Sequence, residues 1–100
     1  MSSTGVNPNS EYSTYRKTLI ATDCDISRWF EEGQQTGCSH LILVYDSVMR
    51  NDYPVYVHPY EDVSSVYNKY NELSQQMIIG VYDLRLKKEP QLGKKWPFNF

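Results

Sequence analysis

The chain has 100 residues, of which 40% are apolar and 22% are charged, a composition that fits one small domain and leaves no material for a second core. Its formal net charge of −2 at pH 7 argues against a strongly basic nucleic-acid-binding protein. The longest apolar run, residues 41–45, is far shorter than the roughly 20 residues of a membrane-spanning helix. Nine of the aromatic residues are tyrosine, a side chain that suits surfaces which contact a partner.

The first part of the chain is predicted to lie outside the folded core. Residues 1–14 are rich in Ser, Thr and Asn and show no hydrophobic period, as in a flexible tail. They carry no secretory signal, so we expect a cytoplasmic protein, or one in the host cytoplasm if a phage encodes it. Cys24 and Cys38 are then expected to be free thiols. Residues 15–22 are β-prone, and both an added strand and a loose arm remain open.

A helix is predicted over residues 23–36. Thr22 and Asp25 resemble a capping box at its start, and Gly37 supplies a left-handed stop. Gly33 lies on the apolar side, which predicts close packing of the helix on a sheet. The apolar stripe has the spacing i, i+3, i+4, i+7 and consists of Ile26, Trp29, Phe30 and Gly33.

A β-hairpin is predicted to follow, with strands at residues 39–46 and 53–58. The first strand is apolar on both faces, as expected for an inner strand. Pro54 cannot donate to a ladder, so the second strand should lie at an edge or begin at Pro54. A second helix is predicted after Pro59, and its apolar stripe contains Val63, Val66, Tyr67, Tyr70 and Leu73.

The last predicted strand covers residues 77–86 and should pair beside residues 41–45. The element order (β)αββαβ predicts an α+β domain over residues 15–86 with a small, mainly antiparallel sheet. This order is ferredoxin-like if residues 15–22 pair with the sheet. We expect both helices on one face of the sheet. The other face then needs a lid, a polar surface or a second copy, which predicts a homodimer.

The charge is unevenly distributed along the chain. Residues 1–83 hold five basic and eleven acidic side chains, whereas residues 84–100 hold five basic and one acidic. Residues 87–100 are therefore predicted to be a basic C-terminal tail. We expect this tail to fold back on the acidic body of the same or a neighbouring subunit, in preference to binding nucleic acid.

The residues that commonly carry chemistry form no recognisable catalytic or metal motif. Cys24, Cys38, His40 and His58 have a spacing that fits no structural zinc pattern, so no metal or cofactor is predicted. The hairpin places Asp46 at the opposite end from both histidines, which makes a catalytic pair with it geometrically awkward. We therefore do not expect an enzyme.

The tyrosines separate into core and surface groups. Tyr67 and Tyr70 lie on the apolar stripe of the second helix and are expected in the core. If one sheet face is uncovered, Tyr45, Tyr56, His58 and Tyr82 form an aromatic plate that binds a partner; ordinary cross-strand pairing is the structural alternative. The candidate binding residues are Tyr45, Arg50, Tyr53, Tyr56, His58, Tyr60 and Tyr82.

Residues 22–84 resemble a family of small phage and bacterial proteins that has no assigned activity. The resemblance implies a context in which such proteins act on host functions or host defences by binding. It rests on these segments: 29–33 (WFEEG), 37–46 (GCSHLILVYD), 52–57 (DYPVYV), 61–63 (EDV), 67–71 (YNKYN) and 81–84 (VYDL).

The leading hypothesis is a non-catalytic binding protein that presents a tyrosine-rich sheet face or hairpin loop to a protein or small ligand, and that acts as a phage-type inhibitor or anti-defence factor. The alternative is a protein that sequesters nucleotides or nucleotide messengers by aromatic stacking, with Arg50, Lys87 or Lys88 on the phosphates. A small enzyme that uses His40 or His58 with a neighbouring Asp is the third hypothesis.

Overall fold

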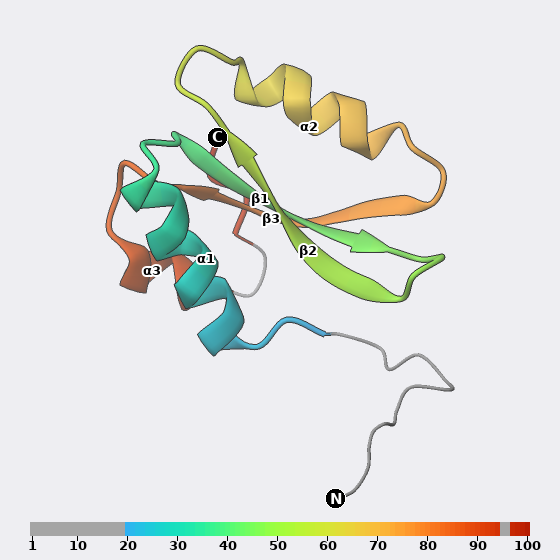
Figure 1. Cartoon of the computed structure of the whole chain (residues 1–100), viewed down its shortest axis with the longest axis horizontal. Coiled ribbons are helices and arrows are strands. Elements are labelled where there is room, and N and C mark those ends of the chain that lie inside the picture. Colours follow the sequence, from blue (N-terminus) through green and yellow to red (C-terminus); the bar gives the residue numbers. More distant parts are fainter. Residues whose placement is uncertain (1–19, 95–96) are drawn as a thin grey trace, which may run out of the picture.

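The computed structural model describes residues 20–94 and 97–100. It confirms a small α+β domain with an antiparallel sheet (Figure 1). Most of the predicted N-terminal strand, residues 15–19, lies outside the described residues, and residues 20–22 are not in a strand. The elements in chain order are α1 (Asp23–Gln35), β1 (His40–Asp46), β2 (Asn51–Val57), α2 (Val63–Asn71), β3 (Gln76–Asp83) and α3 (Lys88–Leu92).

The described sheet has three strands in the order β2-β1-β3, and β1 runs antiparallel to both neighbours. β1 is the inner strand, as its apolar run predicts, and residues 40–44 are all buried. Pro54 lies in β2 at one edge, where its missing N–H leaves no gap in an inner ladder. β3 pairs with β1 as predicted, so α2 crosses from one side of β1 to the other.

β3 contains a bulge opposite Leu43 and Val44. Leu43 pairs with Gly80 and Val44 pairs with Ile78, which leaves Ile79 as an extra residue. Ile78 packs in the cluster that α2 covers, and Ile79 packs against the cluster that α1 covers. The extra residue therefore lies on the same face of the sheet as Leu43, the partner of Gly80.

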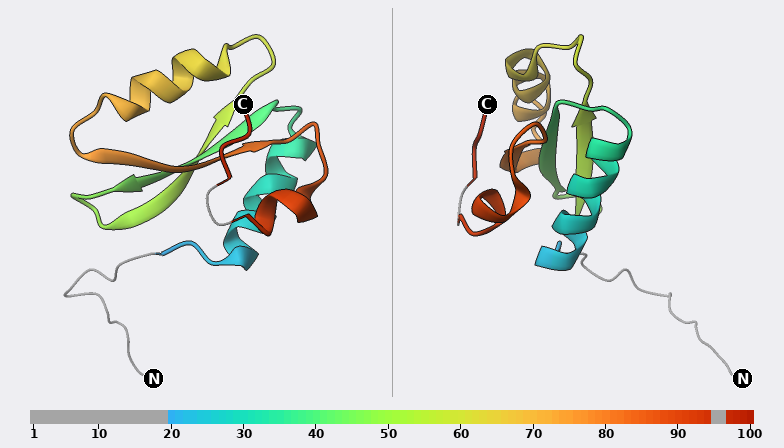
Figure 2. Two further views of the ribbon diagram at one scale, coloured as in Figure 1. Left: turned by 180° about the vertical axis from the view of Figure 1, so that it is seen from behind. Right: turned by 90° about the vertical axis from the view of Figure 1, so that its left-hand side faces the viewer.

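The two main helices cover opposite faces of the sheet (Figure 2). Leu41 and Leu43 of β1 pack in the cluster below α1, which also holds Trp29 and Phe30. Ile42 and Val44 pack in the cluster against α2. The prediction of both helices on one face was therefore wrong. β1 is apolar on both faces, because each face is covered by a different helix.

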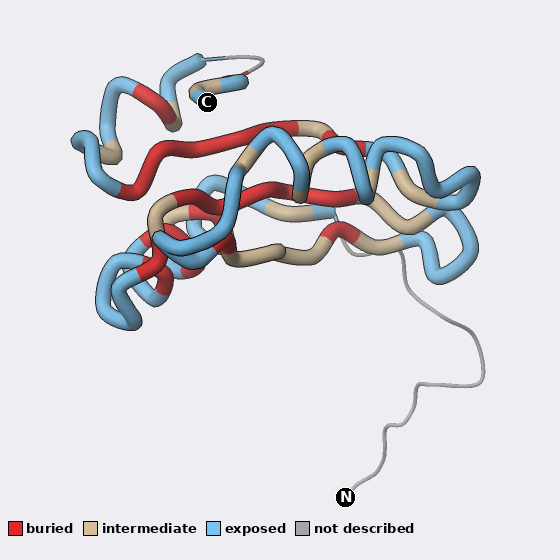
Figure 3. The backbone as a smooth tube through the Cα atoms, turned by 90° about the horizontal axis from the view of Figure 1, so that it is seen from above, coloured by how far each residue is buried: buried red, intermediate tan, exposed pale blue. Residues whose placement is uncertain are grey.

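α1 begins and packs as the sequence predicts. Thr22 Oγ1 accepts the Asp25 N–H at 3.2 Å, and the Asp25 carboxylate accepts the Thr22 N–H at 3.0 Å, which completes a capping box. Gly33 brings the helix close to the sheet, because a Cβ atom at this position would lie 2.6 Å from Leu84 Cδ1 and 3.1 Å from the Tyr56 ring. α2, by contrast, has no fully buried residue (Figure 3).

The predicted basic tail contains α3 and a segment, residues 97–100, that pairs with the outer edge of β3. The Val81 N–H donates to the Pro97 carbonyl at 2.6 Å, and the Asn99 N–H donates to the Val81 carbonyl at 2.9 Å. Lys88 forms an ion pair with Glu31 of α1, an example of the contact expected between the basic segment and the acidic body. None of the described helices combines the length and apolar character needed to cross a membrane.

Candidate binding groove

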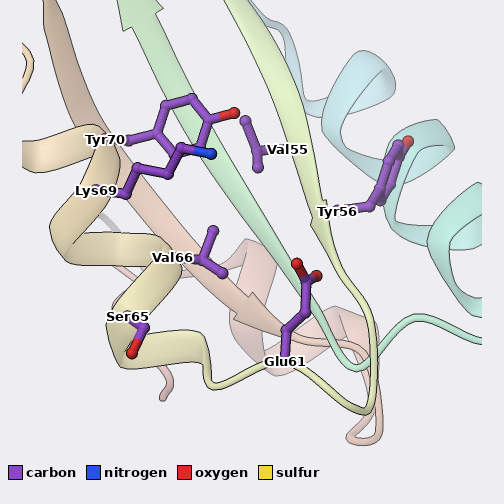
Figure 4. A pocket seen from close by; sticks show the side chains of 7 residues that line it. All are labelled: Val55, Tyr56, Glu61, Ser65, Val66, Lys69 and Tyr70. Atoms are coloured by element: carbon purple, nitrogen blue, oxygen red, sulfur yellow. The ribbon is translucent and has the colours of Figure 1, made fainter.

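A groove of about 270 Å³ lies between the edge strand β2 and helix α2 (Figure 4). It forms because α2 packs mainly on β3 and β1. The face of β2 that points toward α2 is therefore only half covered. We call it the β2–α2 groove. It is lined by Val55, Tyr56, Glu61, Ser65, Val66, Lys69 and Tyr70.

The groove has an apolar middle and a charge toward each end. Val55 of β2 and Val66 of α2 point toward each other across it (Figure 4). Glu61 lies at the end where α2 begins, and Lys69 lies further along the helix beside Tyr70. This combination suits a ligand that has apolar side chains and is polar at its ends.

The loop between β2 and α2 holds Glu61 in place. The His58 N–H donates to Glu61 Oε1 at 2.9 Å, and the Glu61 N–H donates to the His58 carbonyl at the same distance. The next residue, Asp62, caps α2 by accepting the Ser65 N–H at 3.3 Å and the Ser65 hydroxyl at 2.9 Å. These bonds fix where α2 begins, and therefore where the groove ends.

The groove opens beside a sheet edge that no other described strand covers. Within residues 20–94 and 97–100, β2 pairs only with β1, whereas the outer edge of β3 is bridged by residues 97–100. An edge strand presents unpaired backbone N–H and C=O groups to any extended segment that approaches it. The outer edge of β2 therefore provides backbone hydrogen-bonding groups for an extended segment, next to the β2–α2 groove, which can hold its side chains.

The aromatic plate predicted from Tyr45, Tyr56, His58 and Tyr82 is not open to a partner. The register places Tyr56 and Tyr82 on either side of Leu41, on the face that α1 covers. Tyr82 is only 4% exposed, and burial raises the pKa of Tyr82 to about 12. Tyr56 and Tyr82 therefore pack across the strands, which is the structural alternative to a binding plate.

Tyr56 lines the groove, but its side chain points away from it toward α1 (Figure 4). Its hydroxyl donates to Glu32 Oε1 at 3.4 Å. Burial and the neighbouring Glu32 carboxylate raise the pKa of Tyr56 to about 12. Tyr56 therefore contributes its backbone to the groove and its ring to the core below α1.

The other predicted binding residues are spread over the sheet. Tyr45 and Tyr53 lie toward the β1–β2 turn, and the Tyr53 hydroxyl donates to Gln76 Oε1 at 2.6 Å. Arg50, with φ 57°, lies in that turn. Lys87 and Lys88 follow the opposite end of β3, so the structure does not bring Arg50 together with them. No shared phosphate site for the nucleotide hypothesis results from this arrangement.

His58 and Tyr60 lie together in the loop before α2. Their rings stack at 5.3 Å with an interplanar angle of 1°, and Tyr60 is 84% exposed. The His58 Nδ1 atom is 3.8 Å from the thiol of Cys38, and both Cys38 and Cys24 are free. No three metal-ligating residues converge within residues 20–94 and 97–100.

The other histidine, His40, meets an aspartate that the sequence does not point to. His40 Nε2 lies 3.8 Å from Asp83 Oδ2, and both side chains are almost fully buried. Asp83 also accepts two side-chain hydrogen bonds from Arg85, each at 2.9 Å. His40 Nδ1 is 2.9 Å from Ser39 Oγ. These contacts place the pair inside the structure, away from the β2–α2 groove.

Sequence reasoning missed the groove because it took the second helix as a plain core helix. Tyr67 and Tyr70 do pack against the core cluster, as predicted, but both are only half-buried. Tyr70 also lines the groove. The available signal was the combination of an edge strand marked by Pro54 with a short helix that lacks any large aliphatic residue besides valine.

Comparison with known proteins found no matching family model, curated protein or solved structure. The resemblance to small phage and bacterial proteins therefore stays a prediction.

Proposed function

We propose that this protein is a non-catalytic binding protein that takes an extended segment of a protein partner along the edge of β2. The observation that carries this proposal is the β2–α2 groove, which opens beside β2, an edge strand whose outer side has no described neighbour. In strand addition, main-chain hydrogen bonds supply affinity, and pockets for alternate side chains supply specificity. The half-buried Val55 and Val66 provide such a pocket.

The size and form of the groove favour a peptide over an enclosed small molecule. Small-molecule pockets usually measure about 300–1,000 Å³ and surround most of the ligand. The β2–α2 groove, at about 270 Å³, lies near the lower limit of that range, and only one of its walls is a helix. A peptide strand supplies the missing wall itself, because it lies along the open side of β2.

A library of random seven-residue peptides displayed on a carrier tests this function. Peptides selected on the intact protein should shift the amide NMR resonances of β2 and α2. Val66→Arg places a charged side chain in the middle of the groove and should weaken binding at least about tenfold, which is about 1.4 kcal/mol. Val48→Arg is the matched control, because Val48 is 61% exposed in the β1–β2 turn.

Circular dichroism and thermal unfolding should show that both arginine variants remain folded. The proposal is wrong if no peptide is selected, if Val66→Arg binds the selected peptides as well as the unchanged protein does, or if the shifted resonances lie elsewhere.

The prediction of a homodimer was based on an uncovered face of the sheet. Both faces of the sheet are covered, so an open face no longer accounts for a dimer. A second copy paired through β2 is the remaining strand-addition arrangement, and it competes with a peptide for the same edge. Sedimentation over a concentration series, with and without a selected peptide, distinguishes the two occupants.

A further inference from the structure

The charges of the β2–α2 groove give it a direction. Glu61 lies beside the end of β2, just before α2 starts, and Lys69 lies further along α2 toward its end (Figure 4). Because the short loop after Val57 leads directly into α2, the helix runs back along the strand. One end of the groove is therefore acidic and the other is basic.

Both charges are available to a ligand. Neither Glu61 nor Lys69 takes part in an ion pair with another side chain of the described part of the chain. Among the described residues, the Glu61 side chain accepts only a backbone N–H, from His58, and the Lys69 ammonium lies 5.7 Å from the centre of the Tyr70 ring. A ligand that crosses the groove thus meets a carboxylate at one end and an ammonium at the other.

The spacing of these charges matches a short extended peptide. Glu61 lies two residues before α2 begins and Lys69 six residues after its first residue, which is on the order of 12 Å along the helix axis. Five consecutive residues of a strand span about 13 Å from the first to the last. Side chains at the first, third and fifth positions point to the same face of a strand. Such a peptide can therefore place two charges and one apolar side chain in the groove together.

We propose that the groove selects segments with the order basic-x-apolar-x-acidic, read from the N-terminus to the C-terminus; this rests on the peptide-binding function proposed above. Antiparallel pairing is the more stable form of strand addition. In that orientation the N-terminal half of the peptide lies beside the end of β2, next to Glu61. Its C-terminal half lies next to Lys69, and the apolar side chain enters between Val55 and Val66.

Two capped peptides of the same composition test this order. The peptide TKTVTET has the proposed order, and TETVTKT has the reverse. An exposed ion pair is worth about a 1.4- to fivefold change in affinity. With two pairs formed in one peptide and two like-charge contacts in the other, TKTVTET should bind about tenfold more tightly in calorimetric titration.

Variants of the protein show whether these two charges are responsible. Exchange of the charges by Glu61→Lys with Lys69→Glu should invert the preference. Glu61→Gln with Lys69→Gln should abolish it, while the glutamine at position 61 keeps an oxygen acceptor for the His58 N–H. Glu72→Lys is the control, since this exposed residue at the end of α2 does not line the groove.

The outcomes separate the two proposals. If both peptides bind with equal affinity at the groove, the charge order is wrong and the peptide-binding function stands. If TETVTKT binds more tightly to the unchanged protein, the antiparallel orientation is wrong. If neither peptide binds and the random library also yields none, both proposals fail.

Discussion

Gly33 is the residue at which α1 comes closest to the sheet. A glycine inside a helix costs about 1 kcal/mol relative to alanine, so helix propensity alone favours its replacement. The packing acts in the other direction, because a Cβ atom there would lie 2.6 Å from Leu84 Cδ1 and 3.1 Å from two atoms of the Tyr56 ring. Leu84 is itself buried in the core cluster, so its side chain has little room to move away.

Gly33→Ala should therefore lower the free energy of unfolding by about 1–2 kcal/mol, since overpacking of a core typically costs about 1–3 kcal/mol. Urea unfolding measures this change. The matched control is Gly93→Ala, where a Cβ atom would meet its nearest neighbour at 3.7 Å and φ is −77°. That variant should be as stable as the unchanged protein or slightly more stable. An equal loss in both variants would show that the contacts at Gly33 are not decisive.

Among the elements, the C-terminal segment is the one that local sequence describes least well. Its basic composition suggests a solvated tail, yet residues 97–100 bridge β3, and Phe98 and Phe100 pack edge-on against Tyr67 of α2. Gln91 of α3 holds the neighbouring turn, because its side chain exchanges two hydrogen bonds with the backbone of Asp83. These contacts join parts of the chain that are distant in sequence, so no local period reveals them.

Replacement of both Phe98 and Phe100 by alanine should loosen this segment. Each aromatic pair contributes about 0.5–1.5 kcal/mol, so the double variant should lose about 1–3 kcal/mol of stability. Hydrogen exchange at the Val81 amide should accelerate more than exchange within β1, because the Val81 N–H donates to the Pro97 carbonyl. Unchanged exchange at Val81 would mean that the two rings do not hold the segment on β3.

For the whole molecule, acid stability depends on His40. Burial lowers the pKa of His40, and this effect outweighs the nearby Asp83 carboxylate, which raises it. The folded protein thus keeps His40 neutral at a pH where the unfolded chain already binds the proton. Stability should fall as the pH decreases below about 6.5, the ordinary pKa of histidine.

The urea midpoint should therefore decrease between about pH 7.5 and about pH 5.5, and His40→Gln should remove most of that decrease. Asp83 contributes to the pH dependence of stability in a separate, more acidic pH range. Its hydrogen bond from Arg85 is the main cause that lowers its pKa, so this contribution disappears only below the ordinary aspartate pKa of about 4. The same slope in the His40→Gln variant would assign the pH dependence to other groups.

The sequence predicts the elements of this fold better than it predicts their placement. The stripe around Trp29 and Phe30 and the edge position of Pro54 follow from local periods and backbone chemistry. Which face each helix covers is decided by long-range packing: α1 buries Tyr82 on one face, and α2 leaves the groove open on the other. The candidate site depends on where α2 lies across the sheet, and no short segment encodes that position.

The bulge at Ile79 also bears on how this protein should be compared with relatives in other genomes. Without that residue, Ile78 and Gly80 would be consecutive opposite Val44 and Leu43, and the ladder would be regular. Every other side chain of β3 would keep its face. Ile79 is therefore the position where a homologue can lack one residue without inverting the strand, and an alignment should place a single-residue gap there rather than in the β1–β2 turn.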